Sequence, residues 1–225
     1  MGLSYEIEIK SLLGPQEKAD SLRKRITSNP SSSLIGNSKQ LNHYFEGGSL
    51  ERLASTVGVR YLTPEKQAEL KKLSASAKTF SVRTREKGNN VFLVVKASAD
   101  DTTSENGISR FEMEERVSMS LEALDLLILE AGFTYQAKWS REREEYSYDG
   151  IIICLDKNAG YGWLAEFEKM VGSETEMASA REKLRGIMEL LGAEELSQEK
   201  LQRMFDYYNK NWAEYYGTDK TFSIE

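Results

Sequence analysis

Like-charged side chains recur two residues apart in five segments of this 225-residue chain. Residues i and i+2 of a β-strand point to the same face, so each pair would present two equal charges side by side. Three pairs are acidic and two are basic: Glu6/Glu8, Arg83/Arg85, Glu112/Glu114, Arg141/Arg143 and Glu166/Glu168. Carboxylates suit hard divalent cations and arginines suit phosphate oxygens, so the pattern predicts a site for a metal-bound polyphosphate.

Apolar residues alternate with these charges, as Ile7 and Ile9 do beside Glu6 and Glu8. An antiparallel sheet commonly buries one face and leaves charges in water, which is the simpler interpretation of any single strand. Five such strands together favour a barrel whose polar face points inward. Lys10, Lys96 and Asp156 lie on or at the end of such strands and join the candidates.

The elements that position these residues follow from hydrophobic periodicity. Strands are predicted at Tyr5–Lys10, Asn42–Glu46, Phe80–Arg85, Val91–Ala97, Arg110–Val117, Thr134–Tyr148, Ile151–Asp156 and Trp163–Val171. Helices are predicted at Gln16–Ile26, Leu50–Gly58, Pro64–Lys78, Ser120–Gly132, Glu174–Leu191 and Ser197–Trp212, with a polar loop at Ala99–Asn106. The predicted fold is α+β and mainly antiparallel: an eight-stranded closed β-tunnel with peripheral helices.

We expect a tunnel domain over residues 1–173, with a helical insertion at about 50–79, and a helical extension over residues 174–225 packed on the barrel. One cysteine and one histidine exclude a disulfide framework and a histidine-rich zinc site. A net charge of −6 argues against broad binding to DNA. The start is not a signal peptide and no apolar run is long enough to cross a membrane, so we expect a cytoplasmic protein.

The order of the charged motifs resembles the CYTH domain, also called the triphosphate tunnel metalloenzyme family. The segments that carry the resemblance are Glu6-Ile7-Glu8-Ile9-Lys10, Arg83-Thr84-Arg85, Val94-Val95-Lys96, Arg110-Phe111-Glu112-Met113-Glu114, Arg141-Glu142-Arg143, Leu155-Asp156, Gly160-Tyr161-Gly162 and Glu166-Phe167-Glu168. The first motif alone is weak, and the succession over about residues 4–172 is much more specific. The chain departs from the family in Tyr161, where leucine is usual, and in its longer segment 50–79.

The resemblance implies roles for the charged residues. It assigns metal binding to Glu6, Glu8, Asp156, Glu166 and Glu168, with Glu112 and Glu114 holding a second metal or orienting the basic row. It assigns phosphate contact to Lys10, Arg83, Arg85, Lys96, Arg141 and Arg143. Among these, Lys10, Arg85 and Glu8 are the predicted catalytic residues. The cofactor would be Mg²⁺ or Mn²⁺, with two ions expected.

The family includes enzymes with different reactions on triphosphates. We expect a metal-dependent triphosphatase that acts on tripolyphosphate, thiamine triphosphate or a nucleoside triphosphate. The alternatives are a class IV-type adenylate cyclase, which makes cyclic AMP and pyrophosphate from ATP, and a non-catalytic nucleotide or polyphosphate binder. The partner would be this small molecule, without DNA or membrane, and the chain would be a monomer or homodimer.

Other candidate residues lie outside the charged pairs. His43 is a candidate catalytic residue, although a structural histidine at a strand end is commoner. Cys154 lies among apolar residues and is interpreted as a small buried apolar side chain. Aromatic side chains that could stack on a base, but that more commonly belong to a core, are Tyr44, Phe45 and Trp139.

The peripheral helices have simpler interpretations. Gly160-Tyr161-Gly162 is too short for a phosphate loop and predicts a turn. Pro64–Lys78 is rich in lysine and glutamate and predicts a solvated face or a gate at one end of the tunnel. A stripe on the last helix predicts packing against the barrel wall, with dimerisation as the alternative: Leu201, Phe205, Tyr208 and Trp212.

Overall fold

The computed structural model describes residues 5–98 and 111–224. These residues form two compact units. Unit 1 comprises the described parts of Met1–Lys39 and Ser140–Glu225, and unit 2 those of Gln40–Thr103 and Arg110–Trp139. The predicted loop Ala99–Asn106 and the predicted strand start at Arg110 lie outside the described residues. The separate C-terminal extension predicted from residue 174 stays a prediction.

Eight strands of the described chain form one sheet in the order β1-β8-β7-β6-β2-β3-β4-β5. They are β1 (Tyr5–Gly14), β2 (Ser33–Gly47), β3 (Thr79–Lys87), β4 (Asn90–Ser98), β5 (Phe111–Val117), β6 (Phe133–Tyr148), β7 (Ile151–Asn158) and β8 (Gly162–Val171). Every pairing with a resolved register is antiparallel. The α+β class and the eight antiparallel strands are confirmed. The order ends at β1 and β5, so closure into a tunnel stays a prediction.

Seven α-helices accompany these strands in the described residues: α1 (Gln16–Thr27), α2 (Leu50–Leu53), α3 (Val59–Tyr61), α4 (Pro64–Ser76), α5 (Leu121–Glu130), α6 (Met177–Leu191) and α7 (Gln198–Tyr215). The hydroxyl groups of Thr63, Ser120 and Ser197 accept backbone N–H groups at the starts of α4, α5 and α7. The helix predicted over Leu50–Gly58 is not continuous, because a π-helix, η1 (Ala54–Gly58), separates α2 from α3. Side-chain spacing alone does not distinguish one widened turn from a regular helix.

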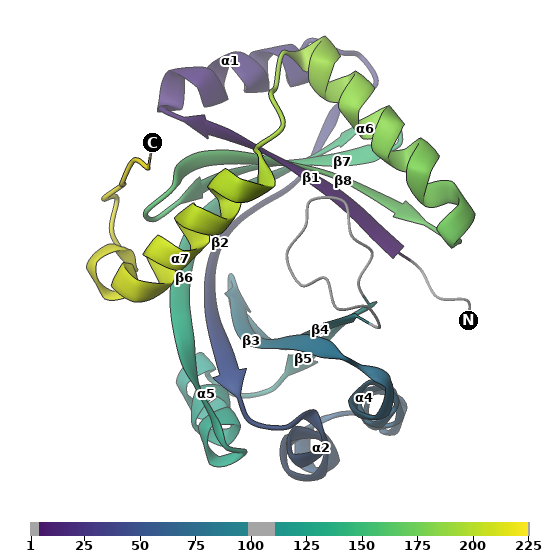
Figure 1. Cartoon of the computed structure of the whole chain (residues 1–225), viewed down its shortest axis with the longest axis vertical. Coiled ribbons are helices and arrows are strands. Elements are labelled where there is room, and N and C mark those ends of the chain that lie inside the picture. Colours follow the sequence, from purple (N-terminus) through teal and green to yellow (C-terminus); the bar gives the residue numbers. More distant parts are fainter. Residues whose placement is uncertain (1–4, 99–110, 225) are drawn as a thin grey trace. The chain divides into compact units, whose positions relative to one another are not determined.

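In unit 1, α1 and α6 pack on one face of β1 and β8 (Figure 1). Ile7 and Ile9 of β1 join Phe167 of β8 and Ile153 of β7 in this core, and each is at most 1% exposed. Burying a side chain of this size stabilises the fold by about 1.5–3 kcal/mol. Because strand residues alternate, the apolar half of each strand fixes the direction of its charged half.

Unit 2 has its own core between strands β3, β4 and β5 and the helices that pack on them. Val82, Leu93 and Met113 contribute from the strands, and Ile128 contributes from α5. Leu70 of α4 is also fully buried in this core. The lysine- and glutamate-rich helix therefore has an apolar side as well as the predicted solvated face.

β2 begins earlier than the predicted Asn42–Glu46, because it already starts at Ser33. The first residues of this strand are mostly exposed, and Leu34 and Ile35 are both more than half exposed. A strand segment without a buried face has no alternation of apolar and polar residues, which explains why the pattern predicted no strand before Asn42.

The C-terminal segment packs against the turn between β7 and β8. Gly160 donates its N–H to the Lys220 carbonyl at 2.8 Å, and Phe222 donates to the Gly160 carbonyl at 2.8 Å. The ring of Tyr208 in α7 lies 5.8 Å from that of Tyr161 in the turn. Of the predicted stripe on α7, only Tyr208 is fully buried; it lies with Met204 and Tyr215 on the buried side. The predicted turn is therefore also the attachment point of the chain's end.

We expect Gly160→Ala to lower the free energy of unfolding by about 3 kcal/mol. Gly160 has a φ of +85°, and an added Cβ would meet Tyr208 Cδ2 at 2.7 Å. Gly186→Ala in α6 is the matched control, because its Cβ meets nothing within 4 Å and should stabilise the helix by about 0.5–1 kcal/mol. Urea denaturation measures both, and equal stability of the two variants would contradict the packing described here.

Candidate active site

The register between β1 and β8 assembles one charged face of unit 1. Glu8 lies opposite Glu168, and Lys10 lies opposite Glu166. Lys10 Nζ contacts Glu8 Oε1 and donates to Glu166 Oε1 at 2.7 Å. A basic group therefore lies between two carboxylates that were predicted from sequence as metal ligands.

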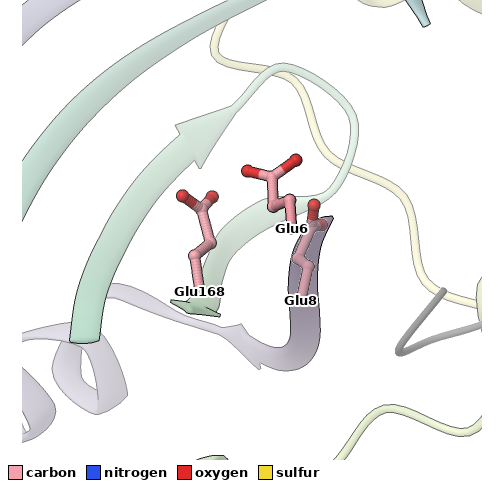
Figure 2. A group of neighbouring side chains, drawn as sticks. All are labelled: Glu6, Glu8 and Glu168. Carbon is pink, nitrogen blue, oxygen red and sulfur yellow. The ribbon is translucent and has the colours of Figure 1, made fainter. Parts of the chain in front are cut away.

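Three carboxylates of this face form a cluster. One oxygen each from Glu6, Glu8 and Glu168 lies within 4.8 Å of the others, and all three side chains project from the same side of β1 and β8 (Figure 2). Burial and the negative charges of Glu166 and Glu6 raise the pKa of Glu168 to about 7. Three partly buried oxygen donors fit a hard divalent cation, whose charge would favour the ionised form of Glu168.

Two arginines from β6 hold the neighbouring acids of β7 and β8. Arg143 donates from Nε to Asp156 Oδ1 at 2.7 Å and from Nη2 to Asp156 Oδ2 at 2.6 Å, and it also contacts Glu166. Arg141 donates to Asp156 Oδ2 at 2.9 Å. Burial raises the pKa of Glu166, but the charges of Lys10, Arg143 and Arg141 outweigh it and hold this pKa well below its usual value. Asp156 and Glu166 are therefore compensated by basic partners.

Cys154 corrects one interpretation from the sequence. It is buried as predicted, but it lies on the charged face and outside the apolar core of unit 1. Its Sγ is 3.8 Å from Glu168 Oε1, and the register places it opposite Glu166. Burial and the surrounding carboxylates raise its thiol pKa, so it is a neutral thiol and a poor nucleophile. Residues 151–155 are all apolar, so their sequence does not indicate which face of the strand Cys154 occupies.

The basic pair of unit 2 lies on β3 and is held by two residues of β2. Asn42 accepts from Arg85 Nε at 2.9 Å, and the Tyr44 hydroxyl accepts from Arg83 Nη1 at 3.0 Å. The Arg83 guanidinium also lies 4.6 Å from the centre of the Tyr44 ring. Asn42 was not a candidate from sequence, although its register opposite Arg85 follows once β2 and β3 are paired.

The acids of β5 lie beside this basic pair. Glu114 accepts from Arg85 Nη1 at 2.7 Å. Lys96 of β4 is paired in register with Glu112 of β5, whose side chain lies outside what the structure describes. Glu114 is therefore an ion-pair partner of Arg85, and its two predicted roles stay predictions.

His43 points to the side of β2 opposite the one that holds the arginines of unit 2. Its neighbours Asn42 and Tyr44 contact the arginines, whereas His43 Nδ1 lies 2.6 Å from Asp125 Oδ2 of α5, and both side chains are buried. Thr84 and Tyr135 donate to the same carboxylate, each at 2.7 Å. The direct catalytic role considered for His43 is therefore wrong in this structure. His43 is buried on the core side of β2 and does not reach the side on which Arg83 and Arg85 lie.

Of the three aromatic candidates for stacking on a base, one lies in an apolar core and two lie outside both cores. Phe45 is 4% exposed in the core of unit 2, so it offers no face to a ligand. Tyr44 and Trp139 belong to neither apolar core, and their ring centres lie 6.3 Å apart. Tyr44 supports Arg83 directly, which corrects the expectation that it is a core residue.

A family model described as the CYTH domain matches residues 4–201. The match contains the charged faces of both units and extends beyond residue 172 into α6 and the start of α7. The chain belongs to the CYTH family. The resemblance predicted from the order of charged motifs is confirmed.

Solved structures support the CYTH fold. A conserved hypothetical protein from Pyrococcus furiosus is 20% identical, with a TM-score of 0.60 over 86% of this chain and 98% of the other. A putative adenylate cyclase from Vibrio parahaemolyticus is 17% identical, with a TM-score of 0.59 over 90% and 99%. A putative adenylyl cyclase from Hippeastrum, described as having a dominant triphosphatase activity, is 16% identical, with a TM-score of 0.52 over 86% and 90%. At these identities the likeness shows the fold alone.

The search of curated proteins returned no match. Among the described residues, none of the helices combines the length and the apolar character needed to span a membrane.

The structure brings the predicted residues of this CYTH domain together in two sets. The set in unit 1 contains Glu6, Glu8, Lys10, Arg141, Arg143, Asp156, Glu166 and Glu168, and the set in unit 2 contains Arg83, Arg85, Lys96 and Glu114. Each set is described within its own unit, and their joint action on one substrate stays a prediction. Sequence reasoning missed Glu145, which lies opposite Cys154 on the charged face of unit 1 and two residues after Arg143.

Proposed function

We propose that this chain is a metal-dependent triphosphatase that hydrolyses the terminal phosphate of a triphosphate. The observation that carries the proposal is the charged face of unit 1, where a carboxylate cluster adjoins three basic side chains. A metal-bound polyphosphate needs oxygen ligands for the cation and cationic donors for the phosphate. Membership of the CYTH family supports the same class of reaction.

The cation would be Mg²⁺ or Mn²⁺, held first by Glu6, Glu8 and Glu168. When bound, it would neutralise phosphate charge and lower the pKa of an attacking water. A second ion would use Asp156 and Glu166, with Glu112 and Glu114 as further acids. These assignments rest on the chemistry of the oxygen donors and on the order of motifs.

The basic side chains exchange partners in this proposal. Without ligand, Arg141, Arg143 and Lys10 neutralise Asp156 and Glu166. Phosphate oxygens offer these donors an equivalent charged partner, and the arginines can contact them in a bidentate way. Asp156 and Glu166 would then be free to act as metal ligands. Charge balance is kept throughout, which avoids the cost of an unpaired buried charge.

Three residues have proposed catalytic roles. Glu8 holds the cation, and Lys10 stabilises the charge that develops on the transferred phosphoryl group. Arg85 stabilises the same charge from unit 2, with Arg83 and Lys96 as further phosphate contacts. Closure of the eight strands into a tunnel would enclose these rows, and it is part of the proposal.

Phosphorus NMR on tripolyphosphate and ATP tests the function. We expect orthophosphate release with Mg²⁺ or Mn²⁺, fastest from tripolyphosphate, and complete loss of turnover with excess EDTA that added metal restores. Pyrophosphate with cyclic AMP from ATP would establish the cyclase instead. Tight binding of tripolyphosphate without turnover would establish a binding protein, and turnover that persists in EDTA would contradict the metal assignment.

A further inference from the structure

A buried carboxylate network lies behind the basic pair of unit 2. The two oxygens of Asp125 accept from Thr84 Oγ1 at 2.7 Å and from the Tyr135 hydroxyl at 2.7 Å, and His43 Nδ1 lies 2.6 Å from Oδ2. Asp125 is 2% exposed, His43 4% and Thr84 0%. Four elements, β2, β3, β6 and α5, therefore meet at one carboxylate.

Asp125 is the exception on the buried side of α5. The other buried residues of this helix are apolar: Leu121, Leu124 and Ile128. A buried carboxylate costs several kcal/mol unless it is fully hydrogen-bonded, and an apolar residue in its place is commonly neutral or stabilising. Burial raises the pKa of Asp125, but the hydrogen bonds from His43, Thr84 and Tyr135 outweigh it and leave the group ionised. Packing alone gives no reason for a charge at this position.

The register shows what the network holds. His43 of β2 and Thr84 of β3 are cross-strand partners. Their neighbours on the same two strands point to the opposite face, where Asn42 holds Arg85 and Tyr44 holds Arg83. Because His43 and Thr84 both bind Asp125, the paired segment of β2 and β3 from which Arg83 and Arg85 project is held in place.

We propose that Asp125 is a positioning residue for phosphate binding, acting through His43 and Thr84 on the orientation of Arg83 and Arg85. The inference rests on the proposed function, because it takes these arginines as phosphate contacts. Arginine is a long side chain, so a small rotation of its backbone displaces the guanidinium by a larger distance. Displacement of a group in an active site by about 1 Å can lower the rate on the order of 100-fold.

The kinetic test compares Asp125→Asn with a core control on the same helix. We expect Asp125→Asn to raise the KM for tripolyphosphate about tenfold and to lower kcat as well, because Arg85 both binds phosphate and stabilises the developing charge. Ile128→Ala removes fully buried apolar volume from α5 and should lower thermal stability while leaving KM unchanged. Equal KM values for the two variants would overturn the proposal.

Substitutions at Thr84 refine the test and replace it if Asp125→Asn does not fold. Thr84→Val keeps the shape and loses the donor to Asp125, so we expect a raised KM. Thr84→Ser keeps the donor and should restore the KM to within about twofold of wild type. A raised KM in both variants, or in neither, would contradict an effect transmitted through this hydrogen bond.

A readout without turnover separates this inference from the proposed function. The Arg85 Nε–H group donates to Asn42. Its proton should therefore exchange slowly with water in the wild-type protein, and the exchange rate can be measured by nitrogen-15 NMR. We expect faster exchange in Asp125→Asn and no change in Ile128→Ala. If the protein hydrolyses no triphosphate, the proposed function fails, and slow exchange retained in Asp125→Asn would independently show that Asp125 does not order Arg85.

Discussion

Glu8→Gln is expected to lower kcat/KM for tripolyphosphate by about 100- to 1000-fold, which corresponds to the several kcal/mol that a correctly held metal ion supplies. Glu8 shares the cluster with Glu6 and Glu168 and contacts Lys10. The amide keeps the size of the side chain but loses its charge, so metal binding should weaken in step with activity. Calorimetry with Mn²⁺ measures that loss without turnover.

The matched control for this change is Glu142→Gln. Glu142 lies between Arg141 and Arg143 in sequence, but its side chain is half exposed and pairs with an exposed Lys39. Surface pairs of this kind contribute about 0–1 kcal/mol, so activity and stability should both be retained. Equal activities of the two variants, with both folded, would exclude the carboxylate cluster as the metal site.

Arg143→Ala should have the largest effect on stability, a loss of about 3–5 kcal/mol in the free energy of unfolding. Arg143 is 8% exposed, and its removal leaves the fully buried Asp156 without its bidentate partner and Glu166 without one of its cationic partners. Arg143→Lys keeps the charge but cannot form the two parallel bonds to Asp156, so we expect an intermediate loss. Denaturation in urea measures both changes.

Divalent metal should partly reverse this destabilisation. With Arg143 absent, the two carboxylates resemble an oxygen site for a hard cation, and a ligand that binds only the folded state stabilises it. We expect millimolar Mg²⁺ to raise the melting temperature of Arg143→Ala more than that of the wild type. Arg185→Ala is the control, because its ion pair with Glu195 is at the surface and contributes little. A loss in Arg143→Ala no larger than in this control would contradict the buried network.

Much of the charged face could be predicted because strand alternation is a local property. Ile7 and Ile9 are apolar and Glu6 and Glu8 are charged, so the two faces of β1 follow from four consecutive residues. The grouping of Lys10 with Glu166 could not be predicted in this way, because it depends on the register of two strands far apart in the chain. Family motifs supplied the grouping that local patterns lack.

The residues that were missed or misplaced share a physical cause. Cys154 lies in an uninterrupted apolar segment, where alternation has no contrast to reveal which side faces the acids. Asp125 is a single polar residue on an apolar helix side, so periodicity alone assigns it no partner. Its hydrogen-bond partners Thr84 and Tyr135 lie 41 and 10 residues away from it in the chain. Tertiary packing, which no short window contains, decides both positions.

The pairing of β1 with β8 also constrains how the chain acquires its carboxylate cluster. Lys10 and Glu166 are 156 residues apart, whereas β3 and β4 form a local hairpin. Contacts that close long loops form late, and synthesis proceeds from the N-terminus at about 5–20 residues per second. β1 must therefore wait for nearly three-quarters of the chain to leave the ribosome before it finds its neighbour. Until then its exposed edge is open to pairing with other chains, so we expect slow synthesis or truncation before β8 to favour aggregation.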